Sequence, residues 1–174
     1  MSSPSAVRRL RKLGFSVFYR LPAPVRRRLV RFAVGKYIVG SVALVRDTGS
    51  DRVLFIRQPP GLGWAVPAGL LDRGERPVEG AVRELFEETG VRVDVDDMQP
   101  AVPNAIVHHR GRWVDMVFEA SVPADEVALR VDGAEVLEAG WFSPRKLPPL
   151  TLATATLLSY YGLGPYAEYP EVRR

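Results

Sequence analysis

Three glutamates at helical spacing are the residues of this 174-residue chain best suited to chemistry. Glu84, Glu87 and Glu88 stand at i, i+3 and i+4, so on a helix their side chains share one face. Three carboxylates there repel each other unless a positive charge lies between them, and Mg²⁺ or Mn²⁺ takes oxygen ligands. The spacing indicates a divalent cation site, with a solvated acidic helix as the alternative.

A helix over residues 77–89 is needed to hold these glutamates. Its apolar positions recur at i, i+3, i+4, i+7 and i+11, a pattern typical of one buried helix face. They are Val78, Ala81, Val82, Leu85 and Thr89. Pro77 suits the first turn and Gly90 the exit. Arg83, four residues before Glu87, is predicted to pair with it and orient its carboxylate without binding the metal itself.

The run from Gly69 to Val91 resembles the box of the Nudix hydrolase family. That box reads Gly-x5-Glu-x7-Arg-Glu-U-x-Glu-Glu-x-Gly-U, where U is apolar, and all nine specified positions match here. Single acidic helices are common, but the complete pattern is specific. The solvated-helix alternative therefore becomes the weaker one.

The similarity extends to about residues 37–150. Trp64-Ala-Val-Pro67 lies upstream of the box, and Trp141-Phe-Ser-Pro144 resembles the late strand and turn of the family. The resemblance implies an α/β fold, an α/β/α sandwich with a mixed β-sheet and a loop–helix–loop catalytic motif. Many members have two glycines where this chain has Ala68-Gly69, and we expect alanine to be tolerated unless it needs positive φ.

The implied activity is attack of water on the diphosphate linkage of a nucleoside diphosphate derivative. ADP-ribose-like compounds, nucleotide sugars and nucleoside triphosphates are the candidate substrates. Two alternatives stay open: an RNA-end pyrophosphohydrolase, and a regulatory module that binds a nucleotide without turnover. Dimers are frequent among similar enzymes, so a homodimer is a further expectation.

By the resemblance, the metal ligands are Glu84, Glu87 and Glu88, with the carbonyl of Gly69 as a frequent additional one. Glu75 matches the first glutamate of the box, which is more often structural than a direct ligand. The metal, Mg²⁺ or Mn²⁺, would neutralise the diphosphate oxygens and lower the pKa of the attacking water.

The general base has two candidate sources. Some family members use a box glutamate, here Glu84 or Glu87. Others use a carboxylate in the loop before the late strand, for which Glu135 is our candidate and Glu138 the next choice. An ordinary exposed loop is the alternative for these last two residues.

Candidate substrate-binding residues are polar or aromatic side chains at predicted loops. They are Arg57, Trp64, His108, His109, Arg110 and Arg112. The four around the turn after residue 107 suit a phosphate or a base, but polar residues are also usual in turns, and we favour that interpretation. Trp64 either stacks on a base or lies in the core.

Charge divides the chain into two parts. Residues 1–36 hold ten Lys or Arg and no Asp or Glu, whereas the other 138 residues hold 14 basic and 20 acidic groups, a net charge of −6. Helices are expected over residues 5–13 and 24–34, with apolar stripes among arginines. We favour a stripe that packs on the domain; weak contact with an anionic membrane surface or with nucleic acid is the alternative.

The remaining elements follow from periodicity and turn residues. Strands are expected over residues 37–46, 52–57, 91–95, 101–108, 113–121 and 136–142, and a last helix over residues 150–163. The predicted organisation is a basic helical arm (1–36), one hydrolase domain (37–166) and a tail (167–174). The chain has no cysteine and no apolar run of about 20 residues, and it lacks a convincing signal peptide, which fits a cytoplasmic protein.

Overall fold

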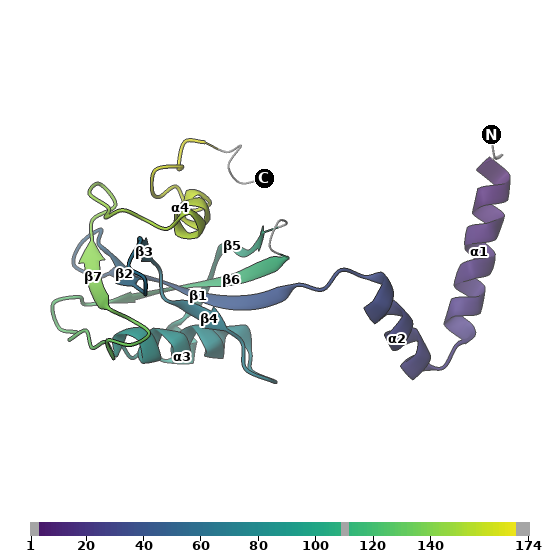
Figure 1. The fold of residues 1–174 in the computed structure, drawn as a ribbon, viewed down its shortest axis with the longest axis horizontal. Helices are drawn as coiled ribbons and strands as arrows, with labels where there is room; N and C mark the ends of the chain where they lie inside the picture. The colour runs from purple at the N-terminus through teal and green to yellow at the C-terminus, as the bar shows by residue number, and fades with distance from the viewer. Residues whose placement is uncertain (1–3, 109–111, 170–174) are drawn as a thin grey trace. The chain divides into compact units, whose positions relative to one another are not determined.

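The computed structural model describes residues 4–108 and 112–169, and the chain forms two compact units, Met1–Tyr37 and Ile38–Arg174. The first unit holds α1 (Pro4–Arg20) and α2 (Ala23–Ala33); the second holds all other elements (Figure 1). None of the helices in the described part of the chain is long and apolar enough to span a membrane.

A mixed seven-stranded sheet forms the centre of the second unit. Its strands are β1 (Ile38–Asp47), β2 (Val53–Arg57), β3 (Trp64–Ala65), β4 (Ala68–Leu70), β5 (Gln99–His108), β6 (Trp113–Val122) and β7 (Glu138–Phe142). The order is β3-β2-β1-β6-β5, with β4 paired to β1 and β7 to β2. Strands β1 and β6 run parallel over ten residue pairs, and the other pairs are antiparallel.

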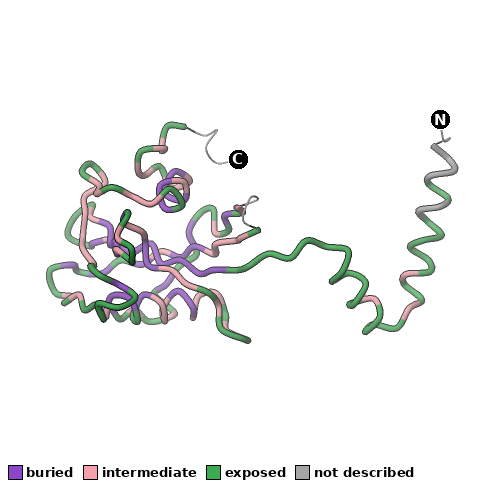
Figure 2. Tube along the Cα trace, viewed as in Figure 1, coloured by how far each residue is buried: buried purple, intermediate pink, exposed green. Residues whose placement is uncertain are grey.

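Each face of the sheet carries its own hydrophobic core, because side chains alternate along β1. Buried residues are found in β1 and in the helices α3 and α4 (Figure 2). Val42 and Leu44 face a cluster that contains Leu157 and Leu158 of α4 (Leu152–Ser159). Ala43 and Val45 face the cluster beneath α3 (Pro77–Thr89). Helices therefore cover both faces, which confirms the predicted α/β/α sandwich with a mixed sheet (Figure 1).

The helix α3 begins and ends at the residues that the sequence predicted. Pro77 opens it, and the Glu79 carboxylate accepts a hydrogen bond of 2.9 Å from the Arg76 backbone N–H. Gly90 ends it with φ of 74°, a left-handed conformation that favours glycine. Fully buried Leu85 anchors the helix on the sheet, and such burial stabilises by roughly 1.5–3 kcal/mol.

Two of the other predicted elements were wrong or misplaced. No strand forms over residues 91–95: Val91 is buried in the cluster beneath α3, and a 3₁₀ helix follows at Val95–Asp97. The alternating valines there pack inward without pairing to a neighbouring strand. The last helix is shorter than predicted, because Thr151 caps it and its backbone pairs with Trp64 instead.

The arm has longer helical structure than predicted. Helix α1 continues beyond residue 13 to Arg20, through Gly14 and Ser16, and Pro22 separates it from α2. Continuous helix through these residues keeps the basic and apolar positions in register over 17 residues.

Asp47 ties together the turn after β1 and the loop after β6. Its buried carboxylate accepts hydrogen bonds from the backbone N–H groups of Gly49 and Ala124 and from the side chains of Ser50 and Arg52, all between 2.5 and 3.1 Å. These bonds, that from Ser50 foremost, hold the pKa of Asp47 well below its ordinary value of 3.8.

Replacing Asp47 with asparagine should therefore lower thermal stability at neutral pH. A depressed folded-state pKa contributes stability above about pH 4, and this stability is lost as pH falls. We expect the difference in Tm between the wild type and Asp47→Asn to be largest near pH 7 and to shrink below pH 4. Asp94→Asn, at an exposed position, is the control and should leave Tm unchanged. A difference that is constant with pH would contradict this account.

Candidate metal and catalytic site

The three box glutamates differ sharply in exposure along α3. The side chain of Glu84 is 15% exposed and that of Glu87 is 56% exposed, whereas Glu88 is buried. The helix turns its other side, with Ala81 and Leu85, onto the sheet. One helix therefore presents a buried glutamate, Glu88, a mostly buried one, Glu84, and an exposed one, Glu87.

Buried Glu88 accepts hydrogen bonds on both carboxylate oxygens. The backbone N–H of Ala68 and the side-chain amide of Gln58 each donate one, at 2.9 Å. Burial raises the pKa of Glu88 to about 8, and nearby negative charges add to the effect. Those charges belong to Glu84, Glu135 and Glu87. Three other carboxylates thus lie near enough to act on Glu88, two of them on α3 and one in the loop before β7.

Gly69 of β4 lies directly against Glu84. A Cβ atom at this position would come within 2.0 Å of the Glu84 carboxylate oxygen Oε1. The glycine is therefore required for close approach of β4 to the glutamates. Among the described residues other than glycine, Arg112 alone has positive φ, so Ala68 is free of the backbone strain that alanine would meet there.

Arg83 connects the loop before α3 to two of the glutamates. Its guanidinium donates a two-pronged pair of bonds to Glu75, at 2.8 and 3.0 Å, and one to the carbonyl of Leu70 at 2.9 Å. It also donates to Glu84 at 2.7 Å and to Glu87 at 3.0 Å. The contact with Glu87 that the spacing predicted is present, and Glu75 lies at the centre of the loop contacts.

The donor set suits a hard divalent cation. Carboxylate oxygens of Glu84, Glu87 and Glu88 and the carbonyl of Gly69 belong to the ligand types that Mg²⁺ and Mn²⁺ prefer. Burial is the main cause of the raised pKa of Glu88, and the neighbouring negative charges, which a bound cation would offset, add to it. In the part of the chain that the structure describes, no three acidic or histidine side chains converge closely enough to hold a metal ion as they stand.

Glu135 lies in a loop that is held in a defined conformation. The Asp132 carboxylate accepts hydrogen bonds of 3.0 to 3.1 Å from the backbone N–H groups of Ala134, Glu135 and Val136. These bonds lower the pKa of Asp132, and Val136 is buried. The exposed Glu135 side chain is thereby kept near enough to Glu88 for its charge to affect that residue.

Comparison with known proteins identifies the family of this site. Residues 36–160 match the NUDIX domain family. The chain belongs to the Nudix hydrolase family. The Nudix box is the loop and helix from Gly69 to Val91 described above.

Curated relatives are similar in sequence to parts of this Nudix chain. A MutT-like protein of Streptomyces ambofaciens is 41% identical over 61 residues, which are 35% of this chain and 38% of that protein. The human 8-oxo-dGDP phosphatase is 31% identical over 132 residues, 73% of this chain and 37% of that protein. A Myxococcus xanthus protein named octanoyltransferase is matched over 25% of its length. The chain thus spans well under half of these relatives.

Solved Nudix structures share the fold over most of their length. A MutT Nudix hydrolase from Burkholderia pseudomallei is 27% identical, with a TM-score of 0.56, over 69% of this chain and 94% of that one. The NUDIX domain of NrtR from Shewanella oneidensis, solved with ADP-ribose, is 20% identical with a TM-score of 0.58, over 75% and 89%. The latter identity supports the fold alone.

Two of the predicted substrate-binding residues contact the protein itself. Arg57, at the end of β2, forms an ion pair with Glu138 of β7. The Trp64 ring packs edge-on against Phe142, with 4.7 Å between ring centroids, and it borders the core on the α4 side. This packing favours the core interpretation of Trp64 over stacking on a base.

His108 lies on the other side of the sheet from the Nudix helix. His108 Nε2 is 2.9 Å from Asp115 Oδ2, and Asp115 shares a sheet face with Val117, in the cluster covered by α4. The Arg112 carbonyl accepts a hydrogen bond from Ile38. The structure therefore does not bring His108 to the box glutamates, while His109 and Arg110 lie outside the described residues.

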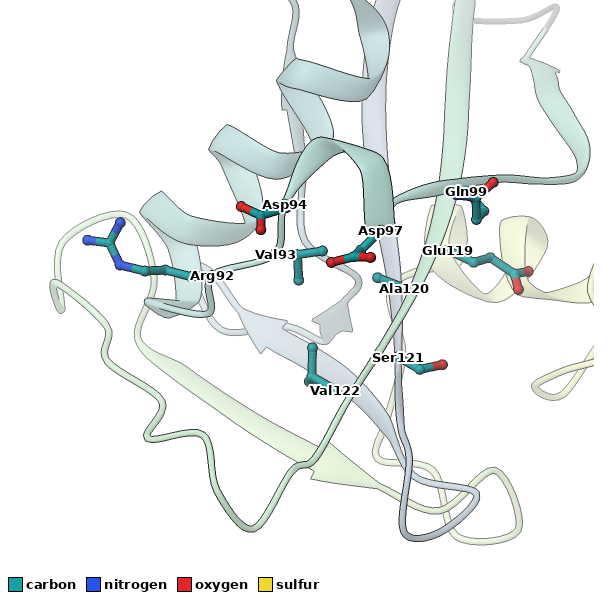
Figure 3. A pocket seen from close by; sticks show the side chains of 9 residues that line it. All are labelled: Arg92, Val93, Asp94, Asp97, Gln99, Glu119, Ala120, Ser121 and Val122. Carbon is teal, nitrogen blue, oxygen red and sulfur yellow. The ribbon is translucent and has the colours of Figure 1, made fainter.

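Two cavities differ in their relation to the site. One of about 730 Å³ is lined from the segment after α3 and from β6, and none of the box glutamates borders it (Figure 3). The other, of about 670 Å³, includes Glu87 and Phe86 of α3, together with Arg92 and Arg130. Arg92 lies over the Phe86 ring at 4.0 Å. The second cavity is the one adjacent to the Nudix glutamates.

Sequence reasoning missed two residues that shape the Nudix site. Gln58 binds Glu88 from the loop after β2, and Asp132 holds the Glu135 loop. A single glutamine in a loop has no spacing that would single it out. Asp132-Gly133 is a residue pair typical of turns, so a turn held by the Asp132 side chain could have been predicted from the sequence.

Proposed function

We propose that this protein hydrolyses the diphosphate linkage of a nucleoside diphosphate derivative with the aid of Mg²⁺ or Mn²⁺. The observation that supports this most is the arrangement of the complete box, in which Glu84, Glu87 and Glu88 line one helix beside Gly69. Glu84, Glu87 and Glu135 are close enough to buried Glu88 for their charges to add to the effect of burial on its pKa, and such a group of carboxylates supplies the oxygen ligands that a hard cation takes.

Residues of the chain have distinct proposed roles in this reaction. Glu84, Glu87, Glu88 and the Gly69 carbonyl would hold the metal, which when bound neutralises phosphate oxygens and lowers the pKa of water. Glu135 is the proposed general base, with Glu84 and Glu87 as alternatives.

The substrate proposal is a small nucleotide with a diphosphate. The names of similar proteins point in different directions: an 8-oxo-dGDP phosphatase among curated relatives, and an ADP-ribose complex among solved structures. The cavity beside Glu87 is lined by two arginines and an aromatic ring, groups suited to phosphate and to a base or sugar, and also by the carboxylates of Glu126 and Asp132. ADP-ribose, nucleotide sugars and nucleoside triphosphates are therefore the compounds to compare.

A substrate panel with product identification by mass tests this proposal. We expect turnover of at least one compound with Mg²⁺ or Mn²⁺, products that contain a nucleoside monophosphate, and loss of turnover when EDTA removes the metal. RNA with a 5′-triphosphate belongs in the same panel. A protein that is inert toward every compound with both metals, yet is thermally stabilised by one nucleotide, would instead be a binding module.

A further inference from the structure

The basic arm (residues 1–36, described from residue 4) combines positive charge with apolar side chains on two helices. Over residues 1–36 the chain has ten Lys or Arg and no acidic group, while the rest has a net charge of −6. A segment of one sign complements a surface of the opposite sign, and the Nudix chemistry proposed above makes no use of it.

Helix α2 has one mostly apolar side and one mostly basic side, with Val30 as an apolar residue on the basic side. Val25, Leu29 and Phe32 recur at i, i+4 and i+7 on one side, and Arg27 and Arg31 lie on the other at i and i+4. The helix has no buried residue; Leu29 is 47% and Phe32 88% exposed. An apolar face this open has no partner within the arm.

Helix α1 carries exposed apolar residues beside its basic ones. Leu13 and Val17 lie one above the other at i and i+4, directly beside the row formed by Arg9 and Arg20, and Lys12 lies on the far side of that row. Three aromatic residues occupy its last two turns: Phe15, Phe18 and Tyr19. Arg26 of α2 lies over the Tyr19 ring at 5.8 Å, so aromatic and cationic groups meet where the helices adjoin.

We propose that the arm is a peripheral membrane-binding element that lies on an anionic lipid surface. Amphipathic helices with Lys and Arg on the polar face, and Leu, Phe or Tyr opposite, bind in the plane of the membrane interface. Basic residues add attraction to anionic headgroups. A nucleic acid would need the arginines, but it would leave the aligned leucine and valine faces of both helices without a role. The combination of both faces favours lipid.

Vesicle binding by the full chain tests the proposal. In flotation assays, the protein should partition onto phosphatidylcholine vesicles that contain about 30% phosphatidylserine or phosphatidylglycerol, and little onto vesicles of phosphatidylcholine alone. Binding should weaken as salt rises, because salt screens exposed charges. Equal binding to neutral vesicles, or none to either, would overturn the proposal.

A matched pair of variants assigns the binding to the arm. Arg27→Gln with Arg31→Gln removes two charges from α2 and should lower the partition coefficient about 30-fold. Arg145→Gln with Lys146→Gln removes two exposed charges from the other unit and should change it little. Leu29→Ser with Phe32→Ser should also weaken binding, although charge is unchanged. Equal effects of both charge variants would contradict the proposal.

Two further measurements separate the competing occupants of the arm. Tm of the Leu29→Ser and Phe32→Ser variant should equal that of the wild type. A lower Tm in this variant, together with no vesicle binding by the wild type, would mean that the arm packs on the domain instead. Tight binding of the wild type to single-stranded RNA that is lost in the Arg27→Gln and Arg31→Gln variant, with no binding to anionic vesicles, would assign the arm to nucleic acid and overturn the lipid proposal.

Discussion

Glu87→Gln is expected to lower kcat/KM by roughly 10²- to 10³-fold on whichever substrate the panel identifies. Glutamine keeps the size of the side chain but loses the charge that a divalent cation requires. Because the Glu87 side chain is 56% exposed and its hydrogen-bond partner Arg83 keeps other contacts, little stability should be lost. Activity and Tm should therefore separate in this variant.

Three measurements make the Glu87→Gln result specific to metal binding. Hydrolysis rates at saturating Mn²⁺ give the loss in kcat, titration calorimetry gives the affinity for Mn²⁺, and thermal unfolding gives stability. Affinity for Mn²⁺ should fall together with activity. Full activity in Glu87→Gln would remove the proposed metal site.

Glu79→Gln is the matched control, because it makes the same change on the same helix. Glu79 lies in the first turn of α3, where it accepts a hydrogen bond from the Arg76 backbone, and glutamine also accepts at this capping position. Activity should stay near that of the wild type. A loss equal to that of Glu87→Gln would mean that the charge of the whole helix matters, and not one ligand.

The parts of the fold that were predictable from sequence are those with local signals. Pro77 and Gly90 fix the ends of α3, and its apolar spacing fixes the buried face. The valines at 91, 93 and 95 gave the same period-two signal as a strand. Val91 and Val93 nevertheless pack beneath α3 and Val95 begins a 3₁₀ helix, and period alone does not reveal whether a partner strand is available.

The site was predictable where a motif specifies it and not where tertiary packing does. Gly69 and the three α3 glutamates have fixed spacing, and the structure brings Gly69 against Glu84. His108 was selected from residue type, but the alternation of β6 places its partner Asp115 on the α4 face. The face of the sheet on which a hairpin residue lies depends on the register of the two strands. The residue types of a short polar turn do not determine that register.

Arg83→Met should have the second large effect, and it should act on stability and activity together. The half-buried guanidinium gives Glu75 two hydrogen bonds, and this bonding holds the pKa of Glu75 below its usual value. Methionine has a similar length and no charge, so Glu75, with 13% of its side chain exposed, would lose its charged partner and keep only the hydrogen bond from the Asp72 backbone N–H. Leaving such a carboxylate without a charged partner should lower the free energy of unfolding by roughly 2–3 kcal/mol.

The same substitution also removes the contacts that orient Glu84 and Glu87, so kcat/KM should fall by about 10- to 100-fold. Arg83→Lys keeps the charge but cannot reproduce the two-pronged contact with Glu75, and its stability should lie between those of the wild type and Arg83→Met. Chemical denaturation and steady-state kinetics on the same samples measure both effects.

Arg76→Met is the control for Arg83→Met. Arg76 also forms an ion pair with a glutamate, Glu79 in the first turn of α3, but this pair is exposed to solvent. The Arg76 and Glu79 side chains are 67% and 40% exposed, and such surface pairs contribute about 0–1 kcal/mol. Arg76→Met should therefore stay close to the wild type in stability and turnover. If Arg83→Met had the same stability and turnover as Arg76→Met, the Arg83 contacts would contribute no more than those of an exposed surface ion pair. If Arg83→Lys behaved as the wild type, charge alone would suffice and the fixed geometry of the guanidinium would have no role in holding the glutamates.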